Sequence, residues 1–343
     1  MKKVLGLGNA LVDIMTRLDH DDYLPQFGLP KGSMTLVDAH RSHKIYDETI
    51  HLEKTVRSGG SAANTIHGLA NLGVETGFIG KIGTDEMGKV FHDDMVNAGI
   101  NAHLSQSHTS TGRAVALISP DTERTFATYL GAAIELSRHD LSSELFSQYD
   151  IFHIEGYIVQ NHSLLEDTLK LAQMMGLKIS LDLASYNVVD QNREFLEEML
   201  KEYVDIVFAN EDEARSLTGH EPAGALEKLA ELCEIAVVKV GKEGSLVGSR
   251  RSAVGGQRSA VSSQRSAVSG RRFKIGAIPV KSIDTTGAGD LYASGFLYGM
   301  VQGYSLEKCG RIGAILAGKV IEVIGPKIGE EGWEEVRRMI SEI

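Results

Sequence analysis

Short apolar runs rich in Val, Ile and Phe alternate with longer amphipathic stretches along this chain, and this alternation restricts the fold more than any other feature. Apolar runs of four to eight residues are typical of buried strands, whereas apolar residues spaced three and four apart are typical of helices. We expect strands at 3–7, 76–82, 150–154, 178–183, 206–209 and 235–240. We expect helices at 62–72, 86–98, 163–175, 194–202, 211–217 and 223–232. Strands alternating with helices predict an α/β fold on a mostly parallel sheet.

Two stretches break this rhythm. Residues 29–38 and 112–130 are extended in character and partly alternating, and Pro120-Asp121 makes a turn within the second stretch. They predict strands of a second, smaller sheet inserted into the α/β body. We therefore expect a single domain over residues 1–343, with lid segments at about 12–57 and 100–131.

The segment 250–272 is an oddity of composition. Arg-Ser-Ala-Val occurs three times at seven-residue spacing, and the segment holds six arginines and no acid. Its Gly and Ser content cannot sustain a coiled-coil seam. Two interpretations stay open: a basic arm that binds an anionic partner, or a low-complexity loop insertion tolerated between extended segments at 245–248 and 273–278.

Composition and charge restrict the kinds of molecule that this protein is expected to bind. A 343-residue chain with 42% hydrophobic residues can bury a sizeable core, and its net charge of −11 argues against nucleic acid and anionic membranes. No apolar run approaches the roughly 20 residues needed to span a bilayer. The two cysteines, Cys233 and Cys309, give no disulfide framework. We expect a cytoplasmic protein with a small-molecule substrate, either a monomer or a homodimer.

The strongest chemical signal is Asp284-Thr-Thr-Gly-Ala-Gly-Asp290, followed directly by an apolar helical stretch. Small residues bring the backbone close to a ligand, and the N–H groups of Gly287, Ala288 and Gly289 would point at an anion from a helix N-terminus. Asp290 would lie beside that anion, where a carboxylate can accept a proton from a hydroxyl. The alternative is a plain glycine-rich turn with a helix-capping aspartate.

This segment resembles the signature of the ribokinase-like (PfkB-type) carbohydrate kinases. Further landmarks follow in order: Gly8-Asn-Ala-Leu-Val-Asp13, Ser58-Gly-Gly-Ser-Ala-Ala-Asn64, Asn210-Glu-Asp-Glu213 and Val240-Gly-Lys-Glu-Gly244. The resemblance implies a three-layer sandwich with a mostly parallel central sheet and a small inserted β-sheet lid. It also implies transfer of the γ-phosphoryl group of ATP to a hydroxyl, with Mg²⁺ and, as an open question, a monovalent cation.

The resemblance also implies roles for single residues. Asp290 would be the base, Gly287, Ala288 and Gly289 the anion hole, and Arg124 a lid arginine that covers the phosphates. The acceptor would be bound by Asn9, Leu11, Asp13, Gly59, Gly60, Asn64 and Tyr157. ATP would be bound by Asn210, Gly241, Gly244, Thr286 and Ala314, and Mg²⁺ would be held by Glu213 through water. Several of these residues also have a simpler structural interpretation. These interpretations are a strand-end aspartate in a turn (Asp13), a helix-capping asparagine (Asn64), a solvated helix face (Glu213), a surface cross-strand charge (Arg124) and a core tyrosine (Tyr157).

Three stretches resemble the adenosine-kinase branch of the family: residues 8–14, Lys31-Gly-Ser-Met34 and Asp290-Leu-Tyr-Ala-Ser-Gly-Phe-Leu-Tyr-Gly299. This implies a purine nucleoside as acceptor, phosphorylated at a hydroxymethyl group, with adenosine giving AMP. Tyr157 would stack on the base, and Leu11 and Met34 would wall its slot. The alternatives are a kinase for a free sugar such as ribose or fructose, and a non-catalytic small-molecule binder.

Overall fold

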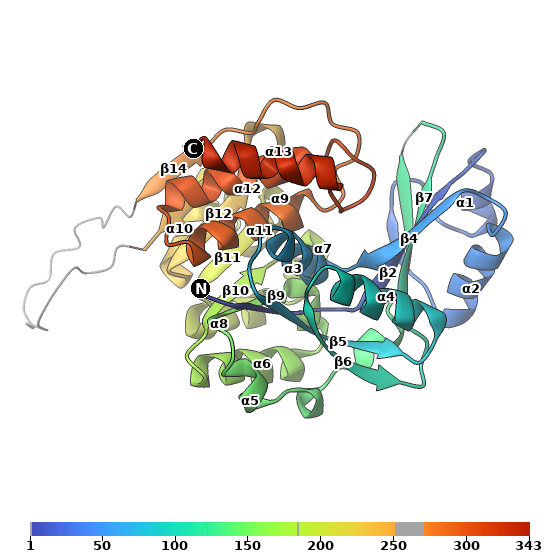
Figure 1. The fold of residues 1–343 in the computed structure, drawn as a ribbon, viewed down its shortest axis with the longest axis horizontal. Coiled ribbons are helices and arrows are strands. Elements are labelled where there is room, and N and C mark those ends of the chain that lie inside the picture. The colour runs from blue at the N-terminus through green and yellow to red at the C-terminus, as the bar shows by residue number, and fades with distance from the viewer. Residues whose placement is uncertain (1, 122, 184, 251–270) are drawn as a thin grey trace, which may run out of the picture.

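A nine-stranded sheet forms the body of this computed structural model, which describes residues 2–121, 123–183, 185–250 and 271–343 (Figure 1). Its strand order is β14-β13-β12-β11-β10-β9-β1-β5-β6. Pairing is parallel from β6 to β12 and antiparallel for β13 and β14. The strands are β1 (Val4–Leu7), β5 (Thr76–Gly83), β6 (Asn101–Ser107), β9 (Ile151–Glu155), β10 (Lys178–Asp182), β11 (Ile206–Asn210), β12 (Ile235–Lys239), β13 (Ser245–Ser249) and β14 (Arg272–Ile275).

Helices cover both faces of this sheet because alternate residues of each strand are apolar on both sides. Ile206 and Phe208 of β11 pack on one face, and Val207 and Ala209 on the other. The first face carries α3 (Ser61–Asn71), α4 (Glu86–Asn97), α11 (Ala288–Val301) and α12 (Leu306–Val320), with α13 (Glu330–Ser341) packed outside α12. The second carries α5 (Ser143–Phe146), α6 (His162–Met174), α7 (Tyr186–Gln191), α8 (Arg193–Tyr203), α9 (Glu211–Thr218) and α10 (Pro222–Leu232). This is a three-layer α/β sandwich, as the sequence predicts.

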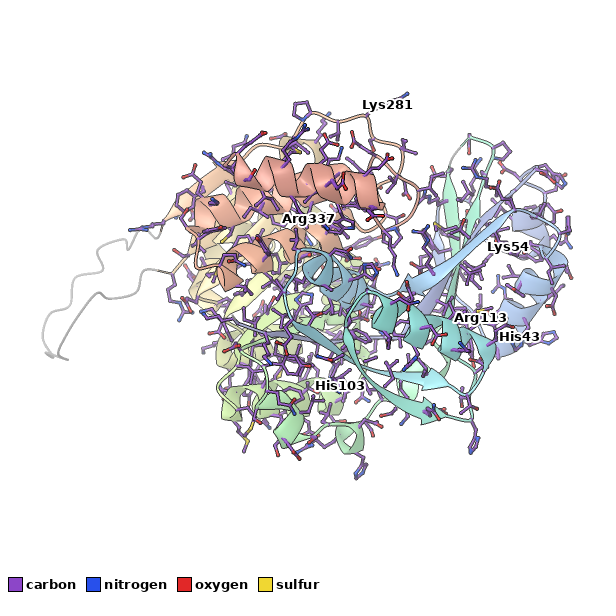
Figure 2. The ribbon with its side chains drawn as sticks, viewed as in Figure 1. His43, Lys54, His103, Arg113, Lys281 and Arg337 are labelled. Atoms are coloured by element: carbon purple, nitrogen blue, oxygen red, sulfur yellow. The ribbon has the colours of Figure 1, made fainter. Side chains whose placement is uncertain are left out.

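A second sheet of five strands, here called the lid, stands beside the body (Figure 1 and Figure 2). Its order is β3-β8-β7-β2-β4, with strands β2 (Leu11–Arg17), β3 (Met34–Leu36), β4 (Lys54–Gly59), β7 (Gly112–Ile118) and β8 (Arg124–Tyr129). The short α1 (Tyr23–Gln26) and the longer α2 (Ala39–Glu48) connect the strands of its first segment. Ile14, Val115 and Ile45 belong to one apolar cluster with the body, so the lid has no separate core.

Two sequence expectations change. Only Met34–Leu36 of the stretch 29–38 is a strand, because Pro30 to Ser33 form a hydrogen-bonded turn before it. The lid segment predicted from residue 100 starts too early, since β6 pairs with β5 in the large sheet. Its polar side chains are those of an edge strand, which faces water on one side. The repeat segment at 251–270 lies outside the described residues.

Candidate active site

The carboxyl ends of β10, β11 and β12 place three polar side chains on neighbouring strands: Asp182, Asn210 and Lys239. Ligands of open α/β sheets bind at this edge. A cavity of about 740 Å³ lies there, and its lining includes these three residues together with Asp290, Gly289 and the predicted Gly241, Gly244, Ala314 and Glu213. Below we call it the donor cavity. Residues from five separate stretches of the sequence thus line one cavity.

The first turn of α11 forms one wall of the donor cavity. Gly287 precedes the helix with φ = 76°, a left-handed conformation that glycine adopts without strain. A Cβ at this position would lie 2.6 Å from Cβ of Pro326, so the close contact with that loop also requires glycine. The first N–H groups of a helix have no partner within it, and with the helix dipole they favour an anion. Ala288 N donates to Thr285 O at 3.2 Å in the structure, so of the predicted anion hole the N–H groups of Gly287 and Gly289 remain the candidates for binding an anion.

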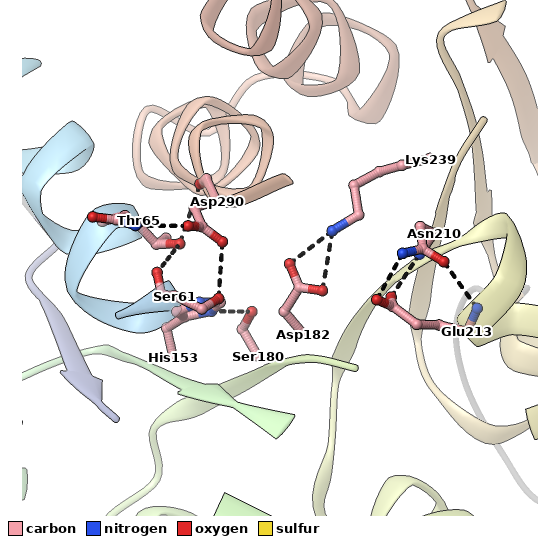
Figure 3. Close-up of polar contacts among 10 residues, drawn as sticks. Ser61, Thr65, His153, Ser180, Asp182, Asn210, Glu213, Lys239 and Asp290 are labelled. Atoms are coloured by element: carbon pink, nitrogen blue, oxygen red, sulfur yellow. Dashed lines mark hydrogen bonds and ion pairs between the residues drawn. The ribbon is translucent and has the colours of Figure 1, made fainter. Parts of the chain in front are cut away.

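Asp290 lies in this first turn and is tied to α3 (Figure 3). Its carboxylate accepts hydrogen bonds from Ser61 Oγ at 2.8 Å and from Asn64 Nδ2 at 2.9 Å. Burial raises the pKa of Asp290 to about 6, although the bond from Asn64 counteracts this shift. The carboxylate is thus held in place, and it is more basic than an exposed aspartate.

The predicted acceptor residues converge around the junctions between the lid and the body. Asp13 of β2 lies against Gly59 of β4, where a Cβ would come within 2.2 Å of the Asp13 carboxylate. Gly60 caps α3 with φ = 94°, and a side chain there would collide with the Asn9 carbonyl oxygen at 2.4 Å. Burial raises the pKa of Asp13 to about 7. Both glycines therefore allow polar groups to approach the backbone closely.

Glu155, which the sequence analysis did not assign, holds this region together. Its carboxylate accepts bonds from Asn9 N at 3.0 Å, Asn9 Nδ2 at 2.7 Å and Ala62 N at 3.0 Å. Burial raises the pKa of Glu155 to about 7. This carboxylate connects the loop after β1 to the start of α3. Its position at the end of the buried strand β9 is the signal that sequence reasoning missed.

A second cavity of about 600 Å³, here called the acceptor cavity, lies next to Asn9. Its lining includes Tyr157, Leu130, Ile134 and Gln160. Tyr157 is partly buried in the short helix after β9, and burial raises its pKa to about 12. Leu11, one of the two predicted slot walls, lies buried on β2, whereas Met34 is 50% exposed on the lid edge strand β3. Neither Leu11 nor Met34 lines the acceptor cavity. Of the three residues predicted to form the slot for a base, the cavity therefore includes Tyr157 alone.

On the donor side, Asn210 and Glu213 form a capping box at the start of α9. Glu213 accepts bonds from Asn210 N at 2.8 Å and Asn210 Nδ2 at 2.7 Å, and Asn210 Oδ1 accepts from Glu213 N at 2.9 Å. Burial raises the pKa of Glu213 to about 7, and the negative charge of Asp182 adds to the rise. The glutamate is buried and not part of a solvated helix face.

Arg124 reaches from β8 of the lid to the loop before α11. Its guanidinium pairs with the buried carboxylate of Asp284 and donates to Thr286 Oγ1. Asp284 also accepts bonds from Thr286 N at 2.9 Å and from Gly325 N. Arg124 is therefore neither a surface cross-strand charge nor a free lid residue: it connects the lid to the segment that forms the anion hole.

Together these features define a phosphotransferase-type site, in which a positioned carboxylate lies in the first turn of α11 on the wall of the donor cavity. A sequence profile described as pfkB family carbohydrate kinase matches residues 31–331. The chain belongs to this family and is a sugar or nucleoside kinase. In the described residues no helix is long and apolar enough to cross a membrane.

Similar proteins carry both nucleoside and sugar kinase names. The crystal structure of adenosine kinase from Sinorhizobium meliloti has a TM-score of 0.84 and 33% identity, covering 98% of this chain and 99% of the other. A probable sugar kinase from Rhizobium etli has a TM-score of 0.85 and 33% identity, covering 98% of both chains. An adenosine kinase of Schizophyllum commune is 28% identical over 98% of each chain, and a 5-dehydro-2-deoxygluconokinase of Geobacillus thermodenitrificans is 26% identical over 90% of each.

Proposed function

We propose that this kinase transfers the γ-phosphoryl group of ATP to the hydroxymethyl group of a nucleoside, with adenosine giving AMP. The observation that carries the proposal is the Asp290 carboxylate, which is partly buried on the wall of the donor cavity, held by Ser61 and Asn64, and located in the first turn of α11. A protein that only binds small molecules does not need a base at this position.

In the proposed reaction Asp290 accepts the proton of the acceptor hydroxyl as its oxygen forms a bond to the γ-phosphorus. The bond from the γ-phosphorus to the bridging oxygen of ADP breaks, and the N–H groups of Gly287 and Gly289 stabilise the charge on the transferring group. Phosphoryl transfer depends mainly on positioning and on charge neutralisation. The raised pKa of Asp290, about 6, makes this carboxylate a better proton acceptor while leaving it ionised near neutral pH.

The donor cavity has the chemistry that ATP requires. Ile278, Ala314, Ala317 and Ile321 supply apolar surface for a base, and Gly241 and Gly244 supply backbone without side chains. Mg²⁺ would be held by Glu213 through water, because this carboxylate lines the donor cavity and carries no lysine or arginine partner among the described residues, whereas Asp182 is already paired with Lys239. Mg²⁺ keeps several waters and needs few protein carboxylates. When bound, it would neutralise phosphate charge.

The acceptor side combines polar groups with an aromatic face, and this combination favours a nucleoside as the acceptor. Asp13, Asn9 and Asn64 offer polar groups for ribose hydroxyls. Tyr157 provides an aromatic face in the acceptor cavity, which suits a stacked base. The adenosine kinases among the similar structures agree with this assignment.

A free sugar or sugar acid is the second candidate. Its support is the dense polar cluster of Asp13, Asn9 and Glu155, together with relatives named sugar kinase and 5-dehydro-2-deoxygluconokinase.

An ADP-release assay with adenosine, inosine, ribose, fructose and 5-dehydro-2-deoxygluconate as acceptors separates the two candidates. We expect adenosine to have the highest kcat/KM. Turnover of a free sugar or sugar acid without turnover of either nucleoside would reject the nucleoside proposal. If the folded protein binds ATP but phosphorylates none of the five acceptors, the proposal of a nucleoside acceptor is rejected.

A further inference from the structure

Lys239 is a buried cation in the donor cavity to which neither the sequence signature nor the proposed reaction assigns a role. It is the last residue of β12, and its Nζ lies 3.0 and 2.8 Å from the two carboxylate oxygens of Asp182 (Figure 3). A Cβ at Gly289 would lie 3.1 Å from this Nζ. The ammonium group therefore lies beside Gly289, with only the space of a missing side chain between them, one residue before Asp290.

The charge of Lys239 is maintained by its surroundings. Burial alone lowers the pKa of a lysine, but the acids Asp182, Glu213 and Asp290 raise it, and the net shift is upward. A charged ammonium group has three N–H donors. Within the described ranges, Asp182 is the one hydrogen-bonded acceptor of Lys239 Nζ. The group thus keeps donor capacity on the wall of a cavity suited to phosphate.

A second lysine of the same sheet shows how a purely structural pair is built. Lys81 of β5 pairs with Asp140, and both Lys81 and Lys239 have side chains 15% exposed. Lys81 Nζ donates to both Asp140 oxygens and also to the Glu135 carbonyl oxygen, each at 3.2 Å. Lys81 lines none of the three cavities described for this chain, and its donors are used by protein acceptors. The two lysine side chains are therefore equally exposed, but they differ in the number of N–H donors that remain free to bind a ligand.

We infer that Lys239 is a catalytic residue whose ammonium group donates to the γ-phosphoryl group of ATP during transfer, with Asp182 holding it in place. This inference rests on the proposed phosphotransfer. Its chemistry adds no step: the acceptor oxygen bonds to the γ-phosphorus, ADP leaves with the bridging oxygen, and the acceptor proton goes to Asp290. Lys239 offsets the negative charge on the group in transit. Such preorganised donors act strongly in a cavity that excludes water.

The first experiment compares Lys239→Met, Lys239→Arg and the matched control Lys81→Met. We expect Lys239→Met to lower kcat about 100-fold, the range found when one preorganised donor is removed. Lys239→Arg should recover part of this loss because it keeps the charge, and Lys81→Met should stay within threefold of the wild type. A kcat of Lys239→Met within threefold of that of Lys81→Met would overturn the inference.

Calorimetric titration without acceptor provides a readout that does not depend on turnover. With Mg²⁺ present, Lys239→Met should lose about tenfold in affinity for ATP, equivalent to about 1.4 kcal/mol, with little change for ADP. Equal losses for ATP and ADP would contradict a contact to the γ-phosphoryl group. If the wild type phosphorylates none of the acceptors, the proposed function is wrong. The titration still shows whether Lys239 contacts the γ-phosphate of bound ATP.

The double variant Asp182→Asn/Lys239→Met separates catalysis from folding, and thermal unfolding verifies that each variant is folded. Removing both charges avoids leaving one buried and unpaired, which is the main cost of breaking a buried pair. A purely structural pair predicts that the double variant regains activity over either single variant. We expect its kcat to stay as low as that of Lys239→Met; recovery to within threefold of the wild type would reject the catalytic role.

Discussion

The donor and acceptor sides of the site differ in how they hold charge. On the donor side, charged and polar groups are paired with one another: Asp182 of β10 pairs with Lys239 of β12, and Asn210 pairs with Glu213 in the capping box of α9. On the acceptor side, Glu155 accepts from neutral N–H groups, and the pKa values of Glu155 and Asp13 rise to about 7 because both are buried. The raised pKa values do not separate the two sides, because burial also raises the pKa of Glu213 to about 7. The difference lies in Lys239, whose ammonium group on the wall of the donor cavity suits an anionic ligand, whereas Glu155 is held by N–H groups.

The two sides also differ in origin. The donor side is built from consecutive strands of one sheet, whereas the acceptor side joins β2, β4 and β9 through the lid. Catalytic groups on the rigid body can stay fixed while lid residues vary the acceptor. Similar structures with 33% identity carry both adenosine kinase and sugar kinase names, and we expect such proteins to differ on the acceptor side. The predictions below test whether the two sides are as distinct as this comparison implies.

The largest effect is expected at Asp290, where the two sides meet. Asp290→Asn should lower kcat by at least about 1,000-fold, because the proton of the acceptor hydroxyl loses its acceptor. Affinity for ATP should change less than threefold, since the nucleotide does not use this carboxylate. Steady-state kinetics and calorimetry test both points. Near-normal turnover would show that another group is the base.

Arg124→Ala should have the next largest effect because it removes the link between the lid and the anion hole. The change leaves the buried Asp284 carboxylate without its guanidinium partner, and buried charges that lose a partner are costly. We expect kcat to fall about 10- to 100-fold and thermal stability to fall as well. Arg124→Lys serves as the charge-preserving control. If Arg124→Ala changes neither rate nor stability, the two sides work independently of this contact.

The pH dependence of kcat/KM tests the environment of Asp290. Its pKa is raised to about 6 and the base must be ionised, so activity should fall about tenfold per pH unit below pH 6. Ser61→Ala removes a bond that lowers this pKa, so the acid limb should move to higher pH, by less than one unit. A limb near pH 4, the usual range of an exposed aspartate, would contradict the buried setting.

The same pKa shift has a consequence for stability. The folded protein holds the Asp290 proton up to about pH 6, whereas the unfolded chain releases it near 3.8. The contribution of neutral Asp290 is therefore complete below pH 3.8 and is lost as pH rises through 6. Relative to the wild type, Asp290→Asn should gain up to about 3 kcal/mol in free energy of unfolding between pH 4 and pH 8. Denaturant unfolding at both pH values measures this difference, and a constant difference would reject the shift.

The smallest effect is expected at the lid edge. Met34 lies outside the acceptor cavity, so it contacts a nucleoside only if the lid edge closes onto the bound substrate. On that hypothesis Met34→Ala should raise KM for adenosine about two- to fivefold, the loss of part of one apolar contact, with no change in KM for ATP. Val96→Ala provides a control, because Val96 is also 50% exposed but lies on α4. An equal effect of both substitutions, or an effect of Met34→Ala on ATP alone, would remove Met34 from the acceptor side.

The body of the fold is predictable from sequence, and the lid only in part. Strands such as β1 and β11 are apolar on both faces because helices cover both, and this leaves a clear pattern. The lid strand β4 (Lys54–Gly59) and the edge strand β6 (Asn101–Ser107) are largely polar, so their pattern resembles that of loops. Helix α2 was not predicted, although Asp38 caps it with a bond to Arg41 N.

The residues of the candidate site also fall into two groups: those that the sequence reveals and those that only the tertiary structure brings together. Asp290 and its glycines stand together in sequence, so the signature reveals them. Lys239 and Asp182 are 57 residues apart, and only the pairing of β10 and β12 with the intervening β11 brings them together. Glu155 precedes the predicted Tyr157 by two residues, yet its bonds to Asn9 and Ala62 depend on tertiary structure.

The position of the β13–β14 hairpin has a practical consequence for protein engineering. The sheet order places these strands at the edge opposite β6, and the chain leaves β13 at Ser249 and re-enters at Arg272. Strand β9, which belongs to the acceptor side, lies several positions away in the same sheet. Gly244, which lines the donor cavity, precedes β13 and so lies at the opposite end of this strand from Ser249. We therefore expect a fluorescent domain or affinity tag grafted between Ser249 and Arg272 to leave both cavities open.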